Sequence, residues 1–198
     1  MRLNSWRKCV LAVTLMVALI TTGCSAQWIS VALADLPVLT QMALNIASLV
    51  VALQSGQQMN PAEAAAIQNI SAEAGRDLNL LQSLYNQYKA NPDATTLQKI
   101  QDEISAINQN LPVLLQAAHI SNPTLNGRVT AAVNLILATV DSFAALIPQS
   151  AAASVRVAAR SKLNIPSAKE LKRQWNQQVC APTGNVALDA TLEGCVIR

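Results

Sequence analysis

Apolar residues recur along most of this chain at alternating spacings of three and four, which is the period of one face of an α-helix. Comparable stripes occupy residues 36–53, 67–88 and 125–147, and no segment shows the strict alternation of a half-buried strand. The sequence therefore predicts four amphipathic helices and an all-α fold. The most regular stripe consists of Leu97, Ile100, Ile104, Ile107, Leu111, Leu114 and Ala118.

Asn-Pro pairs at positions 60, 91 and 122 separate these stripes. Asn is a favourable N-cap and Pro is tolerated in a first helical turn, so each pair is typical of a helix boundary. Their equal spacing indicates helices of equal length in an up-down bundle rather than a sequence repeat, because the apolar phase of the third helix is displaced by one residue. Pro37 is expected in the first turn of its helix, whereas Pro112 is expected to kink or divide the third helix.

The chain changes character after Pro148. Ser167 and Glu170 have the spacing of a capping box, which predicts a short helix that continues through Trp175. Residues 180–198 show no period, and we expect them to form a loop.

The first two dozen residues are typical of an export signal. Basic residues at positions 2, 7 and 8 precede the apolar run 10–20, which is shorter than the about 20 residues that a spanning helix needs. The next four residues, Thr21-Thr22-Gly23-Cys24, resemble the lipobox of bacterial lipoproteins.

This resemblance implies that residues 1–23 are a signal peptide and that Cys24 is acylated and becomes the first residue of the mature protein. Ser25 after the cysteine implies sorting to the outer membrane where the source has two membranes. The alternative is ordinary signal cleavage after Ala26, which would leave a secreted or periplasmic soluble protein.

Removal of the signal changes both the charge and the cysteine count. The formal net charge of +3 is carried by Arg2, Arg7 and Lys8, and from Cys24 onward the 11 basic residues equal the 11 acidic ones. A neutral chain without a basic groove gives no indication of nucleic-acid binding. Cys9 leaves with the signal and Cys24 is the candidate for acylation, so Cys180 and Cys195 remain and are predicted to form a disulfide in an exported protein.

The predicted fold is an up-down four-helix bundle with a short C-terminal helix and a disulfide-stapled tail. Residues 24–148 are expected to form the bundle, and residues 149–198 a basic helical segment followed by the disulfide-closed tail.

Charge is distributed unevenly along the mature chain. Residues 24–155 carry four basic and eight acidic side chains, whereas residues 156–173 carry six basic and one acidic. One interpretation is a solvated basic face that folds back on the acidic bundle, and the other is contact with an anionic envelope surface. The six basic residues concerned are Arg156, Arg160, Lys162, Lys169, Lys172 and Arg173.

The sequence gives no indication of catalysis, of a metal site or of a cofactor. His119 is the only histidine, and position 116 is Gln, so the Glu-x-x-His pair of di-iron bundles is absent from the sequence. Glu73 and Asp77 lie one turn apart but are expected to be solvated beside Arg76. No nucleophile or phosphate-binding motif occurs, so we do not expect an enzyme.

The leading functional hypothesis is a non-enzymatic, lipid-anchored cell-envelope protein that acts as a structural or interaction module. It would contact the membrane through its anchor, and an envelope protein or an anionic surface as a further partner. The first alternative is a bundle that holds an apolar small molecule or lipid between its helices. The second is a membrane-active bundle whose helix 28–53 inserts, although Asp35, Gln41 and Asn45 would be costly in lipid.

Overall fold

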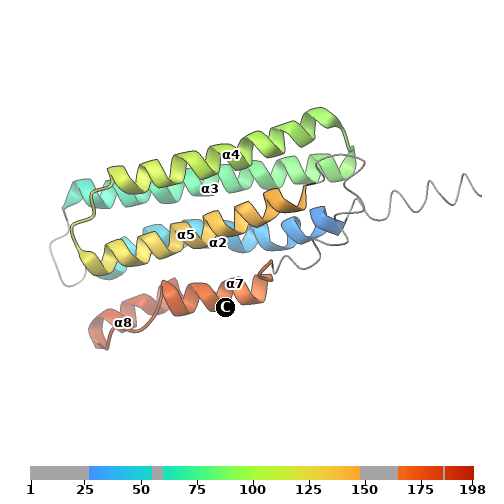
Figure 1. Cartoon of the computed structure of the whole chain (residues 1–198). Coiled ribbons are helices and arrows are strands. Elements are labelled where there is room, and N and C mark those ends of the chain that lie inside the picture. Colours follow the sequence, from blue (N-terminus) through green and yellow to red (C-terminus); the bar gives the residue numbers. More distant parts are fainter. Residues whose placement is uncertain (1–26, 55–59, 148–164, 185) are drawn as a thin grey trace, which may run out of the picture.

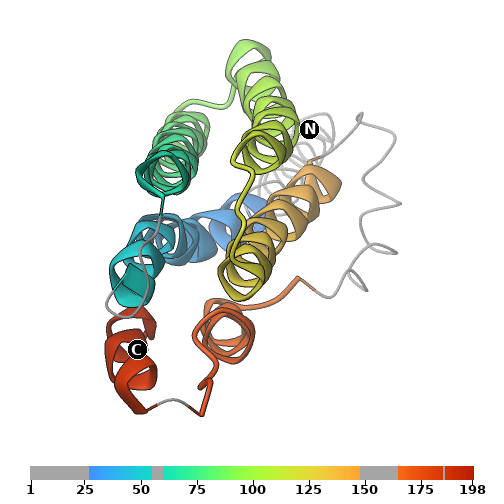
Figure 2. The same ribbon diagram turned by 90° about the vertical axis from the view of Figure 1, so that its left-hand side faces the viewer.

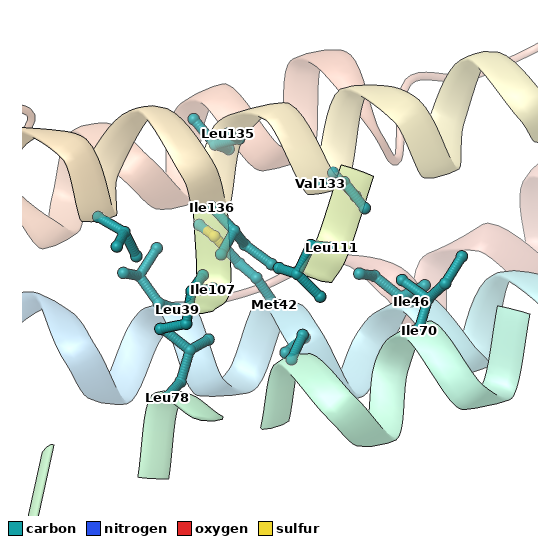
Figure 3. Close-up of a cluster of buried hydrophobic side chains, with 14 of the residues drawn as sticks. Leu39, Met42, Ile46, Ile70, Leu78, Ile107, Leu111, Val133, Leu135 and Ile136 are labelled. Carbon is teal, nitrogen blue, oxygen red and sulfur yellow. The ribbon is translucent and has the colours of Figure 1, made fainter. Parts of the chain in front are cut away.

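Four long helices form in the positions that the apolar stripes predict. The computed structural model describes residues 27–54, 60–147, 165–184 and 186–198 (Figure 1). The long helices are α2 (Gln27–Gln54), α3 (Pro61–Ala90), α4 (Ala94–Ala117) and α5 (Pro123–Leu146). Each stripe faces inward, and the core that they form is aliphatic over most of its length (Figure 3).

Short polar side chains start three of these helices. Asn60 Oδ1 accepts a hydrogen bond from the Ala62 N–H at 2.9 Å, and Asn122 Oδ1 accepts one from the Leu125 N–H at 3.0 Å. At the middle break the cap is Asp93, which accepts from the Thr96 N–H at 2.8 Å, while Asn91 ends α3. The three Asn-Pro pairs are therefore not equivalent positions, as expected if they do not mark a repeat.

The long helices form an up-down bundle in which α2 contacts α3 and α5, and α4 contacts the same two helices. The predicted fold class is confirmed. A third pair of elements packs on this bundle, so the protein has three layers: α3 with α4, α2 with α5, and a C-terminal layer (Figures 1 and 2).

The prediction for Pro37 was wrong, and of the two outcomes expected at Pro112, a kink or a division of the helix, the division does not occur. Pro37 does not lie in a first turn, because α2 begins at Gln27 and Pro37 is exposed within the helix. Pro112 does not divide the third helix, because α4 runs through it to Ala117. A proline removes one helical hydrogen bond, and the buried Ile107 and Leu111 hold α4 in the core just before that point.

Most of the few aromatic side chains gather at one end of the bundle. Trp28 lies 5.6 Å from Tyr85 and 5.8 Å from Tyr88, measured between ring centroids, and Tyr85 lies 6.3 Å from Phe143. We call this the proximal end: α2 begins there, and α3 and α5 end there.

The C-terminal layer consists of α7 (Ala168–Gln178), α8 (Val186–Leu192) and the 3₁₀ turn η2 (Glu193–Cys195). The Ser167 Oγ cap on the Glu170 N–H, at 3.3 Å, confirms the predicted start of α7. The expectation of a loop from Cys180 to Arg198 was wrong. Asp189 accepts hydrogen bonds from the Thr183 and Gly184 N–H groups, and Leu192 and Cys195 are buried, so a short α8 is stabilised by tertiary contacts rather than by an apolar period.

Candidate functional site

The predicted site residues divide into those that the structure describes and those that it does not. Cys24 and the basic residues Arg156, Arg160 and Lys162 lie outside the described residues. The disulfide partners and the basic residues Lys169, Lys172 and Arg173 are described, and all of them belong to the C-terminal layer.

The predicted disulfide is present. Cys180 follows α7 and Cys195 ends η2, and their Cα atoms are 5.8 Å apart. Both half-cystines are buried, and the bond closes the loop that contains α8. On the chain-entropy model, a loop of this size stabilises a fold by about 3 kcal/mol. A disulfide fits an envelope or secreted protein, because such bonds persist in oxidising compartments.

The Cys195 carbonyl accepts one hydrogen bond from the bundle and one from within the C-terminal layer. Asn45 Nδ2, from α2, donates to this oxygen at 3.1 Å, and Trp175 Nε1, from α7, donates to it at 2.9 Å. Within the C-terminal layer, the Asn176 side chain donates to the Ile197 carbonyl and accepts from the Ile197 N–H, each at 3.0 Å.

Arg128, near the start of α5, is buried and binds the end of α7. Its guanidinium donates to the Val179 carbonyl and, at 2.6 Å, to the Ala181 carbonyl. Carbonyls at a helix C-terminus carry partial negative charge, so a cation there is favourable. Burial lowers the pKa of Arg128, and the Asp189 carboxylate opposes this effect.

Asp35 is the matching contact at the other end of α7. It is the only charged residue of α2, it is 3% exposed, and it accepts a hydrogen bond from the Ala168 N–H in the first turn of α7. Burial raises the pKa of this carboxyl from its ordinary 3.8 to about 6, although the Ala168 hydrogen bond acts in the opposite direction.

Sequence reasoning did not assign Asp35 or Arg128 to a site. The available signal was that each interrupts an apolar helix: Asp35 is the lone charge of α2, and Arg128 is the lone basic residue of α5. Such a residue must be paired or solvated, which indicates a partner element but does not say which one.

The predicted basic residues of α7 lie on one face of the helix. Lys169, Lys172 and Arg173 are spaced by three and one residues, and the buried Leu171 and Trp175 lie on the opposite side. Lys169 and Arg173 are exposed, while Lys172 is half-buried and donates to the Arg198 carbonyl at 2.6 Å. We call this outward surface of Lys169, Lys172, Arg173 and the exposed Arg198 the basic face.

The described part of the basic segment, α7, packs on α2 and α5 of the bundle. Arg173 pairs with Glu170 one turn earlier, with Arg173 Nε donating to Glu170 Oε2 at 2.8 Å. This pairing and the Gln174 hydrogen bond lower the pKa of Glu170 to about 2. Across the described ranges, the ion pairs are Arg173–Glu170 and Arg76–Glu73, so Lys169 and Lys172 make none with a bundle carboxylate.

Two shallow hollows flank the basic face. One, of about 490 Å³, lies between α2 and the end of the chain, and the other, of about 440 Å³, lies along α7. Both include Lys172, Ile197 and Arg198, and both are open to solvent. They lie at the surface of the C-terminal layer rather than between the helices of the bundle.

Other carboxylates form no set of metal ligands. Glu73 pairs with Arg76, as the sequence indicated, whereas Asp77 faces Glu103 of α4. Burial raises the pKa of both Asp77 and Glu103, and the Asp77 charge adds to the effect on Glu103. In the part of the chain that the structure describes, no three His, Cys, Asp or Glu side chains are grouped as they would be around a metal ion. His119 is exposed after the end of α4, at a positive φ of 43°.

The two helices of the middle layer are the most apolar. Trp28–Val50 of α2 and Pro123–Leu146 of α5 are long and apolar enough to cross a membrane, yet half of the first window and 44% of the second are buried inside the fold. Because each of these helices lies between two layers, burial on two sides accounts for its composition.

Comparison with known proteins gives no relative from which a role could be transferred. No protein-family model matches the chain, and neither a curated protein nor a solved structure is significantly similar to it.

Proposed function

We propose that this protein is a non-enzymatic, lipid-anchored component of the bacterial cell envelope, in which the helical fold acts as a structural or interaction module. The observation that carries the proposal is the position of α2. This helix begins three residues after Cys24, and it contacts α3, α5, α7 and α8. A lipid anchor at Cys24 would therefore be joined directly to the helix around which the whole fold packs.

The disulfide supports this placement. An exported protein meets an oxidising compartment, where the Cys180–Cys195 bond would persist. Three acyl chains, as the lipobox resemblance implies, would hold the protein almost permanently, since each buried CH₂ contributes about 0.8 kcal/mol.

The module proposal is preferred to the two alternatives for structural reasons. An apolar ligand would need a lined cavity between helices, whereas the two hollows lie on the outer surface and include charged side chains. Insertion of α2 into a membrane would require this helix to leave its contacts with both neighbouring layers.

The test is metabolic labelling with an alkyne fatty acid in cells that express the wild type or Cys24→Ala. The wild type should be labelled and should sediment with membranes, and Cys24→Ala should carry no label. Cleavage after Ala26 would instead leave both proteins unlabelled and soluble, and equal labelling of the two would contradict acylation at Cys24.

A further inference from the structure

Basic and acidic side chains are distributed unevenly along the C-terminal layer. The basic face lies on α7, which begins toward the proximal end of the bundle (Figure 1). Of the acidic residues of this layer, Glu170 lies in the first turn of α7 and pairs with Arg173, whereas Asp189 and Glu193 lie on α8 and η2, away from the start of α7. A protein that is neutral from Cys24 onward therefore presents a local excess of positive charge on one part of one layer.

The contact between α2 and α7 fixes the distance of this face from the proposed anchor. Asp35 accepts the hydrogen bond from Ala168, and it lies eight residues after Gln27. At 1.5 Å per residue, the first turn of α7 is about 12 Å along the axis from the start of α2. The three Cα-to-Cα steps from Cys24 to Gln27 add at most about 10 Å. The basic face is thus within reach of the surface that would hold the anchor.

α7 runs in the same direction as α2, since Ala168 lies against Asp35 while Val179 lies against Arg128 at the other end of the bundle. If the long axis of the bundle stood perpendicular to the membrane, Arg173 would lie farther from the membrane surface than the Debye length of roughly 8 Å, beyond which salt screens the attraction. If the protein lay on its C-terminal layer, all of the basic face would approach the membrane. The charge distribution favours this second orientation.

The hollows beside the basic face suit an amphipathic partner better than a purely polar one. Lys172 and Arg198 supply cationic groups, and the floor of the larger hollow is partly apolar. Val196 next to it is 40% exposed. An anionic phospholipid presents a phosphate together with apolar chains, which matches this combination. The apolar residues of that hollow are Pro37, Val38, Val196 and Ile197.

We propose that the basic face of α7 is a membrane-contact surface that binds the anionic phospholipid leaflet in which the protein is anchored. The proposal rests on the lipid anchor for the identity of the surface. The charge interaction itself is a property of the folded chain and is measurable without the anchor.

The experiment is co-sedimentation with lipid vesicles at low salt, using protein that begins at Ser25 and so contains every described residue. One set of vesicles contains phosphatidylglycerol and phosphatidylcholine, and the other contains phosphatidylcholine alone. Each cation near an anionic surface strengthens binding by about fivefold, so the wild type should bind the anionic vesicles at least about tenfold more tightly. Added salt should remove this preference.

Two triple variants with the same change in net charge locate the contact. Lys169→Gln/Lys172→Gln/Arg173→Gln should lose at least about tenfold in binding to anionic vesicles. The control, Arg76→Gln/Lys89→Gln/Lys99→Gln, changes three exposed cations of α3 and α4 and should retain most of the binding. Circular dichroism checks that both variants are folded.

Three results would overturn the proposal: no preference of the wild type for anionic vesicles, equal losses in the two variants, or undiminished binding by the α7 variant. Because the protein in this assay carries no lipid, its outcome is independent of whether Cys24 is acylated.

Discussion

Asp35 is a buried carboxyl that accepts a hydrogen bond from the Ala168 N–H, and its burial has a cost that depends on pH. The folded state holds its proton up to a pH of about 6, whereas the unfolded chain releases it near the ordinary value of 3.8. Protonation therefore favours folding. The contribution of this group is most favourable below about pH 4 and is lost as the pH rises toward 6.

Replacement of Asp35 by Asn should remove this dependence. The amide stays neutral, and its oxygen can still accept from Ala168, so Asp35→Asn should stabilise the protein by up to about 3 kcal/mol at neutral pH and by little at pH 4. Urea unfolding at a series of pH values measures the difference. Asp77 and Glu103 titrate in both proteins and cancel in the comparison. The control is Asp102→Asn, at an exposed position, which should leave the dependence of unfolding free energy on pH unchanged. If the difference between Asp35→Asn and the wild type did not vary with pH, the Asp35 carboxyl would not titrate in this range.

At the scale of single elements, the bundle was predictable from sequence and the C-terminal layer was not. Each long helix carries its own stripe, and three of the four begin at a side-chain cap, so a local pattern was sufficient to predict their positions. α8 has only seven residues, and apart from the Asp189 hydrogen bonds, the contacts that stabilise it are remote in sequence: the disulfide, and Arg128 on the carbonyls before it. The basic face of α7 was visible as a charge run, but its distance from the start of α2 depends on the Asp35 contact, which no local pattern contains.

Gly75 is a position at which a substitution should stabilise α3. A methyl group there would lie 3.7 Å from Leu44 Cδ2, which is an ordinary contact, so the glycine is not required for close packing. Gly75→Ala should raise the free energy of unfolding by about 1 kcal/mol, because Ala has the higher helix propensity. Thermal unfolding followed by circular dichroism measures the change. Gly184→Ala is a control with the opposite expected effect: Gly184 has a φ of +83°, so a side chain there should lower the stability of the protein. A loss of stability in Gly75→Ala would mean that α2 and α3 are packed more closely than described.

The disulfide should stabilise the C-terminal layer more than the bundle. Cys180→Ala/Cys195→Ala is expected to lose about 2–4 kcal/mol of stability while the long helices persist. Hydrogen exchange should then rise in α7 and α8 and stay low in the cores of α3 and α4. Reduced wild type is the matched control and should behave like the variant. If both cysteines of the native protein reacted with an alkylating reagent before reduction, the bond would not exist in the cell.

At the scale of the whole molecule, the three-layer arrangement connects composition with location. α2 and α5 are apolar because they bury two sides, and α2 is also the helix that follows Cys24. A lipid on Cys24 would give the central helix a fixed end at a membrane and would give the basic face a surface to contact.

Mass spectrometry of the N-terminal peptide tests this feature most directly. Cleavage before Asp35 of protein purified from the envelope releases a short peptide that ends at Ala34. With Cys24 acylated, this peptide should begin at Cys24 and carry the mass of a diacylglyceryl group and a further acyl chain. An unmodified peptide that begins at Gln27 would contradict acylation and would show that the protein is secreted without an anchor.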